Sequence, residues 1–224
     1  MLAAIDRMGN VDGIMATIPH KFALANHGAA LSDRSCSLGV ANVARREADG
    51  RWRGDMLDGE SFVAAILAAE CRLEGRRALL VGSGSAGSAI GLSLLERGAE
   101  GLAVSDVDVA RRDALVTKLA GKYGTRVTAG SGDPRGFSVV VNATPLGMSP
   151  TDPLPLDVSG LTSTILVGDV ITRPEITPLL QAASGIGCAA QTGVGMFEHS
   201  VALKADFFER ALGSEARDRE ELPP

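Results

Sequence analysis

Short, continuous apolar runs recur along the second half of the chain. They are RALLVG (77–82), GLAVSD (101–106), SVVVNA (138–143) and TILVGD (164–169). Apolar residues at consecutive positions, rather than at alternate ones, are typical of strands buried on both faces of a sheet. Helical segments separate the runs, and this alternation predicts an α/β fold with a doubly wound parallel sheet.

The first half of the chain has a different pattern, with shorter elements and more polar positions. Apolar spacing predicts a helix over 2–8, a strand over 13–17, a helix over 20–30 and a strand over 39–45. Asp49-Gly50 lies between two extended pieces and predicts a hairpin turn. A further helix is expected over 59–69, with Phe62, Ile66 and Leu67 on one face.

This change of pattern predicts two domains that meet near residue 73. The first is a smaller α/β domain over residues 1–73, completed by a C-terminal helix over 196–213. The second, over residues 74–195, holds the parallel sheet. Residues 214–224 are charged and end in two prolines, so we expect a flexible tail there.

The composition excludes several classes of protein. A net charge of −5 argues against a nucleic-acid partner. No apolar run approaches the roughly 20 residues of a membrane span, and the start of the chain lacks the pattern of a signal peptide. The three cysteines are far apart, as in free thiols of a reducing compartment, so a cytoplasmic protein is predicted. The three histidines are scattered, so no metal site is expected.

A glycine-rich loop, VGSGSAGSAIG, follows the first buried strand. Gly82, Gly84 and Gly87 have G-x-G-x-x-G spacing, and the residues between them are Ser83, Ser85 and Ala86. In a Rossmann-type domain the first glycine permits a tight turn, the second lets a pyrophosphate approach the backbone, and the third lets the helix pack closely. The amides at the start of that helix would face the phosphates.

The next strand ends in an acid, Asp106, 19 residues after Gly87. A carboxylate there accepts hydrogen bonds from an adenosine ribose and repels a 2′-phosphate. The sequence therefore predicts a dinucleotide cofactor, NAD in preference to NADP. Arg111 and Arg112 are close enough in sequence to complicate that preference.

A lone lysine stands in an unusual place in MATIPHK (15–21). Pro19 biases the residue before it to an extended shape, so Lys21 is expected near the first turn of a helix. A cation there opposes the helix macrodipole. Taken alone, this lysine would be interpreted as an ordinary solvated side chain.

Several motifs in one order change that interpretation. They are ATIPHK (16–21), GVAN (39–42), GDMLDG (54–59), the glycine loop, VNATPLGM (141–148), GDVITRPEITPLL (168–180) and TGVGMFEHSVALKADFF (192–208). Together they resemble the shikimate/quinate dehydrogenase family over nearly the whole chain. The resemblance implies a two-domain enzyme with a substrate domain and an NAD(P)-binding domain. Such an enzyme moves a hydride between a nicotinamide cofactor and a ring hydroxyl of a cyclic polyhydroxy carboxylate, in shikimate or quinate.

The resemblance also implies roles for single residues. Lys21 and Asp58 match the family's catalytic acid/base pair, and a lysine withdrawn from water suits that work. The substrate-binding positions implied by the resemblance are Thr17, Asn42, Thr172 and Ser200. The nicotinamide is implied to lie against Asn142, Thr144, Met148, Gly193 and Met196; helix core is an equally open interpretation for Met196.

The sequence departs from the family pattern in four places. Leu57 replaces a threonine before the catalytic aspartate, Thr172 replaces a tyrosine, and Ser200 replaces a glutamine. No S-x-S motif, which the family uses to hold the substrate carboxylate, precedes Gly13. We therefore expect either an N-terminally shortened substrate domain or a start that lies upstream of Met1. A shortened sheet would expose an edge, which a homodimer could cover.

Two alternatives remain open from the sequence. Polar groups lost from a substrate site change its selectivity, so the chain could act on a modified ring acid, with Leu57 and Thr172 as the discriminating residues. It could also bind NAD without catalysis, as a regulatory homologue. Only an enzyme requires Lys21 for a reaction.

Overall fold

The structure, a computed structural model, describes residues 2–220, with side chains described as far as Arg210. The chain forms two compact units, Met1–Leu57 with Ser200–Pro224, and Asp58–His199. The first boundary therefore differs from the predicted junction near residue 73. The reason is that helix α4 packs against α5 of the second unit, where a Cβ on Gly59 would lie 2.1 Å from the carbonyl oxygen of Ala89.

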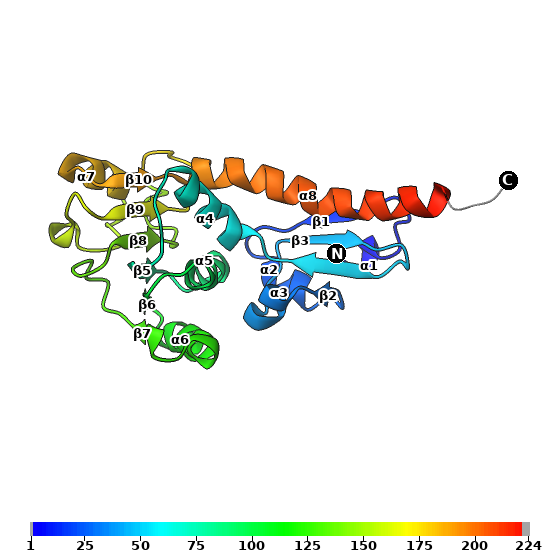
Figure 1. Ribbon diagram of the computed structural model, residues 1–224, viewed down its shortest axis with the longest axis horizontal. Helices are drawn as coiled ribbons and strands as arrows, with labels where there is room; N and C mark the ends of the chain where they lie inside the picture. Colours follow the sequence, from blue (N-terminus) through cyan, green and yellow to red (C-terminus); the bar gives the residue numbers. More distant parts are fainter. Residues whose placement is uncertain (1, 221–224) are drawn as a thin grey trace. The chain divides into compact units, whose positions relative to one another are not determined.

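The Asp58–His199 unit contains a six-stranded parallel sheet in the order β10-β9-β8-β5-β6-β7 (Figure 1). This confirms the predicted doubly wound α/β fold, and the chain reverses its direction of travel across the sheet between β5 and β8. The elements of this unit are α4 (Asp58–Ala68), β5 (Arg77–Val81), α5 (Ser85–Glu96), β6 (Gly101–Ser105), α6 (Val109–Tyr123), β7 (Val127–Ala129), β8 (Val139–Asn142), β9 (Leu166–Asp169), α7 (Pro178–Ile186), β10 (Ala189–Gln191) and the start of α8 (Gly193–Glu220).

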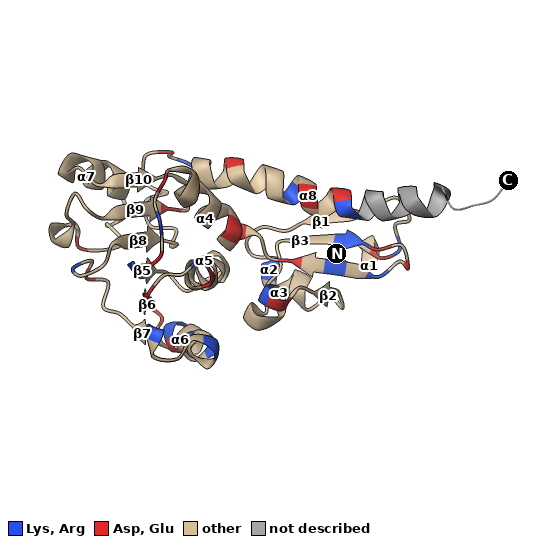
Figure 2. Cartoon of the chain, in the orientation of Figure 1, with Lys and Arg blue, Asp and Glu red and all other residues tan. Residues whose placement is uncertain are grey.

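Helices cover both faces of this sheet. In Figure 1, α5 and α6 lie on one face and α7 on the other. Helix α5 is mostly buried, whereas α6 buries only Leu115 and Leu119. Helix α5 is also almost free of charge, whereas α6 carries arginines and lysines, which Figure 2 shows in blue. The central strands β8 and β9 are buried at every position, as their apolar runs predict. The strand ends are thus held on a rigid core, which suits a site at the carboxyl edge.

The other unit contains a four-stranded sheet in the order β1-β3-β4-β2, in which only the β2–β4 pair is parallel. Its elements are α1 (Leu2–Ile5), β1 (Gly13–Met15), α2 (Lys21–Ala25), β2 (Ala30–Leu31), α3 (Asp33–Leu38), β3 (Val43–Arg46) and β4 (Trp52–Asp55). The predicted hairpin is present between β3 and β4, with Gly50 at a φ of +80°.

Several elements of this unit differ from the sequence-based expectation: the helix predicted over 2–8 ends at Ile5, and the strand predicted over 39–45 begins at Val43. The helix predicted over 20–30 stops at Ala25, because Gly28 takes a φ of +81° and the chain then enters β2. Helix α3 was not predicted from the apolar pattern. It begins where the Ser32 hydroxyl accepts a hydrogen bond from the Ser35 amide, and it ends at Gly39 in the left-handed conformation. These two caps were visible in the sequence as a serine before a short run and a glycine after it.

Part of α8 completes this unit, since residues from Ser200 onward group with it. Phe207 packs in one apolar cluster with Val43 and Leu57. The Arg45 guanidinium lies 4.8 Å from the centre of the Phe207 ring. A flexible tail was predicted over 214–224, but the backbone continues as helix α8 as far as Glu220; residues 221–224 lie outside the described part of the chain.

Candidate functional site

The three glycines of the loop after β5 have three different surroundings. Gly82 has a φ of +101°, and a Cβ there would lie 2.8 Å from the backbone of Ala143. A Cβ on Gly87 would lie 2.0 Å from the carbonyl oxygen of Gly82. At Gly84, by contrast, a Cβ would meet no atom within 4 Å. Two glycines are therefore required by the fold itself, and the middle one leaves space through which a ligand can reach the backbone.

Helix α5 begins directly behind this space. Gly84 is its N-cap, and the first amides of a helix have no intrahelical acceptor. Ser85 and Ala86 open the helix, and both the amide dipoles and the exposed N–H groups favour an anion. The loop thus fits the pyrophosphate of a dinucleotide by its own geometry.

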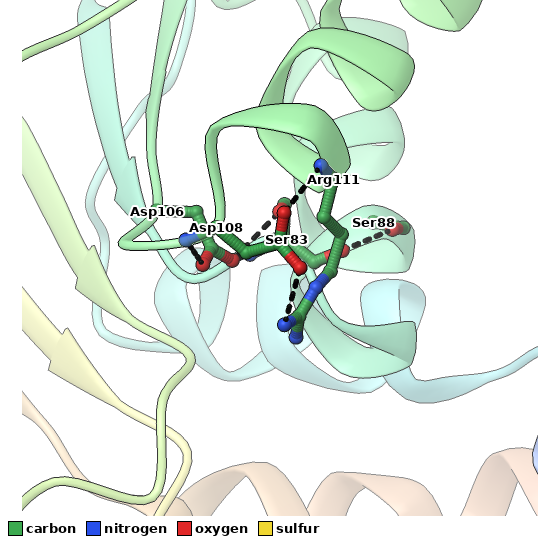
Figure 3. A network of polar contacts seen from close by, with 5 residues as sticks. All are labelled: Ser83, Ser88, Asp106, Asp108 and Arg111. Carbon is green, nitrogen blue, oxygen red and sulfur yellow. Dashed lines mark hydrogen bonds and ion pairs between the residues drawn. The ribbon is translucent and has the colours of Figure 1, made fainter.

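Asp106 lies beside the loop at the carboxyl end of β6 (Figure 3). Its Oδ2 accepts hydrogen bonds of 2.7 Å from both the amide and the hydroxyl of Ser83, and its Oδ1 accepts one of 2.9 Å from the Asp108 amide. Burial raises the pKa of Asp106, but these hydrogen bonds and Arg111 outweigh it, so the net pKa lies below the ordinary value. The group is therefore an ionised carboxylate, held where an adenosine ribose would approach the loop.

The arginines that follow Asp106 are paired with other acids. The Arg111 guanidinium donates to Oδ2 of Asp108 at 3.1 Å, and Arg112 donates to Asp113 at 2.8 Å (Figure 3 shows the first pair). Asp108 also caps α6 by accepting from the Arg111 amide. Helix α6 therefore starts with its positive charges partly neutralised within the helix.

A polar network around the fully buried Asn142 closes the end of β8. The Asn142 side chain donates to the Leu146 carbonyl and to Asp169, each at 3.1 Å, and its oxygen accepts from the amide and hydroxyl of Thr144. Asn142 has no exposed surface and its amide uses all of its hydrogen-bonding capacity inside the protein. Its side chain thus holds the loop 143–148 in shape, while Thr144 is half-buried on that loop.

Asp169, which the sequence did not single out as a site residue, is the centre of this network. Its carboxylate accepts from Asn142, from the Thr177 hydroxyl at 2.9 Å and from the Ile171 amide at 3.0 Å. Thr177 in turn caps α7. Burial raises the pKa of Asp169 and is the dominant effect, since the group has no exposed surface. An acid at the end of a buried strand was the only sequence signal for it.

The loop after β8 and the start of α8 hold the remaining residues assigned to the nicotinamide. Gly147 has a φ of +111° and donates its amide to Asp152 at 3.0 Å, which leaves Met148 exposed. A Cβ on Gly193 would lie 2.3 Å from the Ile171 carbonyl oxygen, so the start of α8 packs tightly on the loop after β9. Met196 is half-buried on the next turn.

Thr172 is exposed in the loop that follows β9. It lines a cavity of about 260 Å³ together with Arg173, Val194 and Phe197.

In the first unit, backbone hydrogen bonds connect the segments that contain Lys21 and Asn42. The Ala41 amide donates to the Lys21 carbonyl at 3.0 Å, and the Ala16 amide donates to the Asn42 carbonyl at 2.8 Å. Both side chains are buried, and the Asn42 amide oxygen accepts from the Leu57 amide at 2.9 Å. Lys21 begins α2, as predicted.

The remaining assigned residues are distributed between the two units. Thr17 is exposed in the turn before α2. Ser200 is buried and accepts from the Lys204 ammonium at 3.2 Å. Asp58 is buried and is the first residue of α4 and of the second unit.

Leu57 is the residue before Asp58 and ends the first segment of the first unit. Its side chain is 4% exposed and packs with Val43 and Phe207 in the core of the first unit. Its backbone amide donates to the Asn42 side chain, and a part for Leu57 in substrate selectivity stays a prediction.

Two absences hold for the described part of the chain. Across it, no three histidine, cysteine, aspartate or glutamate side chains gather as they would around a metal ion. None of the helices within residues 2–220 is both long and apolar enough to cross a membrane.

Comparisons with known proteins identify shikimate and quinate dehydrogenases as similar to this chain. The shikimate dehydrogenase (NADP(+)) of Rhodospirillum rubrum is 35% identical over 205 residues, which are 88% of this chain and 72% of that protein. The quinate/shikimate dehydrogenase (NAD(+)) of Corynebacterium glutamicum is 31% identical, over 84% of this chain and 69% of that protein. The solved structure of quinate dehydrogenase from Corynebacterium glutamicum in complex with NAD superposes with a TM-score of 0.79, at 30% identity, covering 88% of this chain and 72% of that one. No family model matches the chain.

Proposed function

The chain belongs to the shikimate/quinate dehydrogenase family, and from that premise we propose that it is an NAD(P)-dependent oxidoreductase. It moves a hydride reversibly between a nicotinamide cofactor and a ring hydroxyl of a cyclic polyhydroxy carboxylate of the shikimate or quinate type. The observation that carries the proposal is the glycine loop, in which Gly84 leaves open space before the α5 amides while Asp106 is fixed alongside.

We propose NAD as the preferred form of the cofactor. Most of the curated relatives are named for NADP(+), and the quinate/shikimate dehydrogenase of Corynebacterium glutamicum is named for NAD(+). In this chain Asp106 presents an ionised carboxylate at the loop, and Arg111 is occupied by Asp108. A carboxylate accepts hydrogen bonds from a ribose 2′-hydroxyl and repels a 2′-phosphate. The ratio of the two dissociation constants tests this preference directly.

Lys21 and Asp58 are the proposed acid/base pair. When bound, the nicotinamide supplies the acceptor for the hydride that leaves the carbinol carbon. The hydroxyl proton must leave in the same step, and the Lys21 amine takes it; in the reverse direction the Lys21 ammonium returns it. Asp58 is proposed as the second member of the pair, through which the proton is passed on. The burial of both side chains supports the assignment, since lysine and aspartate are almost never buried without a reason.

The other assigned residues have supporting roles in the proposal. Thr17, Asn42, Thr172 and Ser200 contact the substrate. Thr144, Met148, Gly193 and Met196 shape the nicotinamide subsite. Asn142 shapes that subsite indirectly, because the hydrogen bonds of its side chain hold loop 143–148 in place.

The first experiment is to measure NADH formation with shikimate and with quinate, beside a calorimetric titration of NAD. Lys21→Ala is expected to lower kcat by about 10²- to 10⁴-fold, the usual contribution of a general acid/base group, with an unchanged Kd for NAD. Lys122→Ala is the matched control, since that lysine is exposed on α6 and pairs with Glu96. A Lys21→Ala protein that retains full turnover would remove Lys21 from the chemistry. NAD binding without turnover of either acid would instead favour a modified ring acid or a non-catalytic homologue.

A further inference from the structure

A cavity of about 430 Å³ lies beside Asp106 at the carboxyl ends of β6 and β7. Asp106, Val107, Asp133, Arg135, Leu156 and Asp157 are among its lining residues. Leu156 belongs to a hydrophobic core cluster of this unit, so the cavity has an apolar part next to its charged residues. Val107 is 98% exposed, an unusual state for a β-branched apolar side chain that follows a buried strand. A flat apolar ring such as adenine would cover it.

The charge of the cavity is predominantly negative. Three carboxylates, those of Asp106, Asp133 and Asp157, line it with one guanidinium, that of Arg135. Hydrogen bonds from Arg135 hold the pKa of Asp133 below its ordinary value, and hydrogen bonds from Ser159 do the same for Asp157. All three acids are therefore ionised at neutral pH.

The single positive charge is held by one of these acids. Arg135 donates from Nε to both Asp133 oxygens at 2.9 Å and from a terminal nitrogen to Oδ2 at 2.7 Å. The Arg135 amide also donates to Asp133 at 3.0 Å. Arginine has a planar fork of donors that suits a phosphate as well as a carboxylate. Asp133 thus occupies the group that could otherwise bind a phosphate in this cavity.

We propose that the Asp133–Arg135 pair determines cofactor specificity: Asp133 keeps the Arg135 guanidinium from a 2′-phosphate at the adenosine end of the cofactor, so the cavity accepts NAD and disfavours NADP. This inference rests on the proposed dinucleotide function and extends it to residues on the loop after β7. Asp106 and the Asp133–Arg135 pair line the same cavity, so both would act on the adenosine end of the cofactor.

The test uses two probes of the adenosine end, titrated calorimetrically into the full chain without substrate. The probe 5′-AMP represents NAD and 2′,5′-ADP represents NADP. Asp133→Asn removes one negative charge and frees Arg135, so 2′,5′-ADP is expected to bind about tenfold more tightly, while the Kd for 5′-AMP changes less than about twofold. Adding Arg135→Gln to this variant should abolish the gain.

The chain contains a close structural control. Asp49 and Arg51 form the same Asp-x-Arg arrangement in the β3–β4 turn, with the Arg51 amide donating to Asp49 at 3.0 Å and Nε at 2.7 Å. Asp49→Asn makes the same change of net charge outside the cavity and should leave both Kd values unchanged.

The outcomes separate the inference from the function on which it rests. Tight binding of 5′-AMP with no gain for 2′,5′-ADP in Asp133→Asn would overturn the inference and leave the proposed function standing. An equal gain for both probes, or a gain that survives Arg135→Gln, would also overturn it. If the wild-type chain binds neither probe and does not bind NAD, the dinucleotide function itself is wrong and the inference falls with it.

Discussion

A Gly84→Ala substitution is expected to weaken dinucleotide binding while leaving the fold intact. The backbone at Gly84 has φ −69° and ψ −172°, which alanine adopts readily, and its Cβ would meet no protein atom within 4 Å. The methyl group would instead occupy the space in front of the α5 amides. Only a ligand that approaches the backbone there would meet it.

The magnitudes follow from these surroundings. Forcing a methyl group into a packed contact costs about 1–3 kcal/mol, so the Kd for NAD should rise by about 5- to 150-fold. Alanine is a poorer N-cap than glycine, but it reduces the entropy of the unfolded chain by a comparable amount. The free energy of unfolding should therefore change by less than about 1 kcal/mol, the size of either opposing effect.

Two further glycine-to-alanine substitutions serve as controls for the effects on stability and on binding. At Gly87 the new Cβ would lie 2.0 Å from the Gly82 carbonyl oxygen, so Gly87→Ala should lower the free energy of unfolding by about 1–3 kcal/mol as well as weakening binding. Gly121 lies in α6 with no atom near its missing Cβ. Gly121→Ala should stabilise the helix by about 0.5–1 kcal/mol and leave binding unchanged.

Calorimetric NAD titration and denaturant unfolding followed by circular dichroism measure both quantities on the same proteins. Wild-type affinity in Gly84→Ala would refute the reasoning, because no ligand would then use the open space. Destabilisation of Gly84→Ala to the level of Gly87→Ala would refute it differently, by showing that the space at Gly84 is needed for folding.

Two other changes test the structure away from the loop. In Asp169→Asn the side-chain NH2 group must point either towards the donors of Asn142 and Thr177 or towards the Ile171 amide, so one buried donor is left without an acceptor. The free energy of unfolding should therefore fall by about 1–3 kcal/mol and the KM for the cofactor should rise. The exposed Asp113→Asn is the control and should change neither, and an unaltered KM for the cofactor in Asp169→Asn would exclude a positioning role for the network. The hydrogen bond from His27 lowers the pKa of Asp6, so this carboxylate stabilises the fold above its unfolded pKa, and that stability is lost as the pH falls through the lower folded value. Asp6→Asn should therefore unfold with a weaker dependence on acid pH than wild type, measured by the fluorescence of Trp52, whose indole donates to Asp6 at 2.9 Å; identical acid profiles would contradict this.

Local patterns were sufficient wherever the physical cause is itself local. Consecutive apolar residues predicted the strands that the structure contains as β5, β6, β8 and β9, because both faces of a central parallel strand are buried. The spacing of Gly82, Gly84 and Gly87 was also recognised without a distant partner, since the positive φ at Gly82 and the close approach of Gly87 to the Gly82 carbonyl are local, although the approach of Gly82 to Ala143 is not.

Only the tertiary structure decided the features that depend on residues far apart in the chain. Asp169 and Asn142 are separated by 27 positions, and adjacent parallel strands bring their side chains into contact. Leu57 packs with Val43 and Phe207, which lie far from it in the sequence. The type of a residue determines which contacts it can make. Its burial and its partners depend on which elements pack together, and this packing is determined by residues along the whole chain.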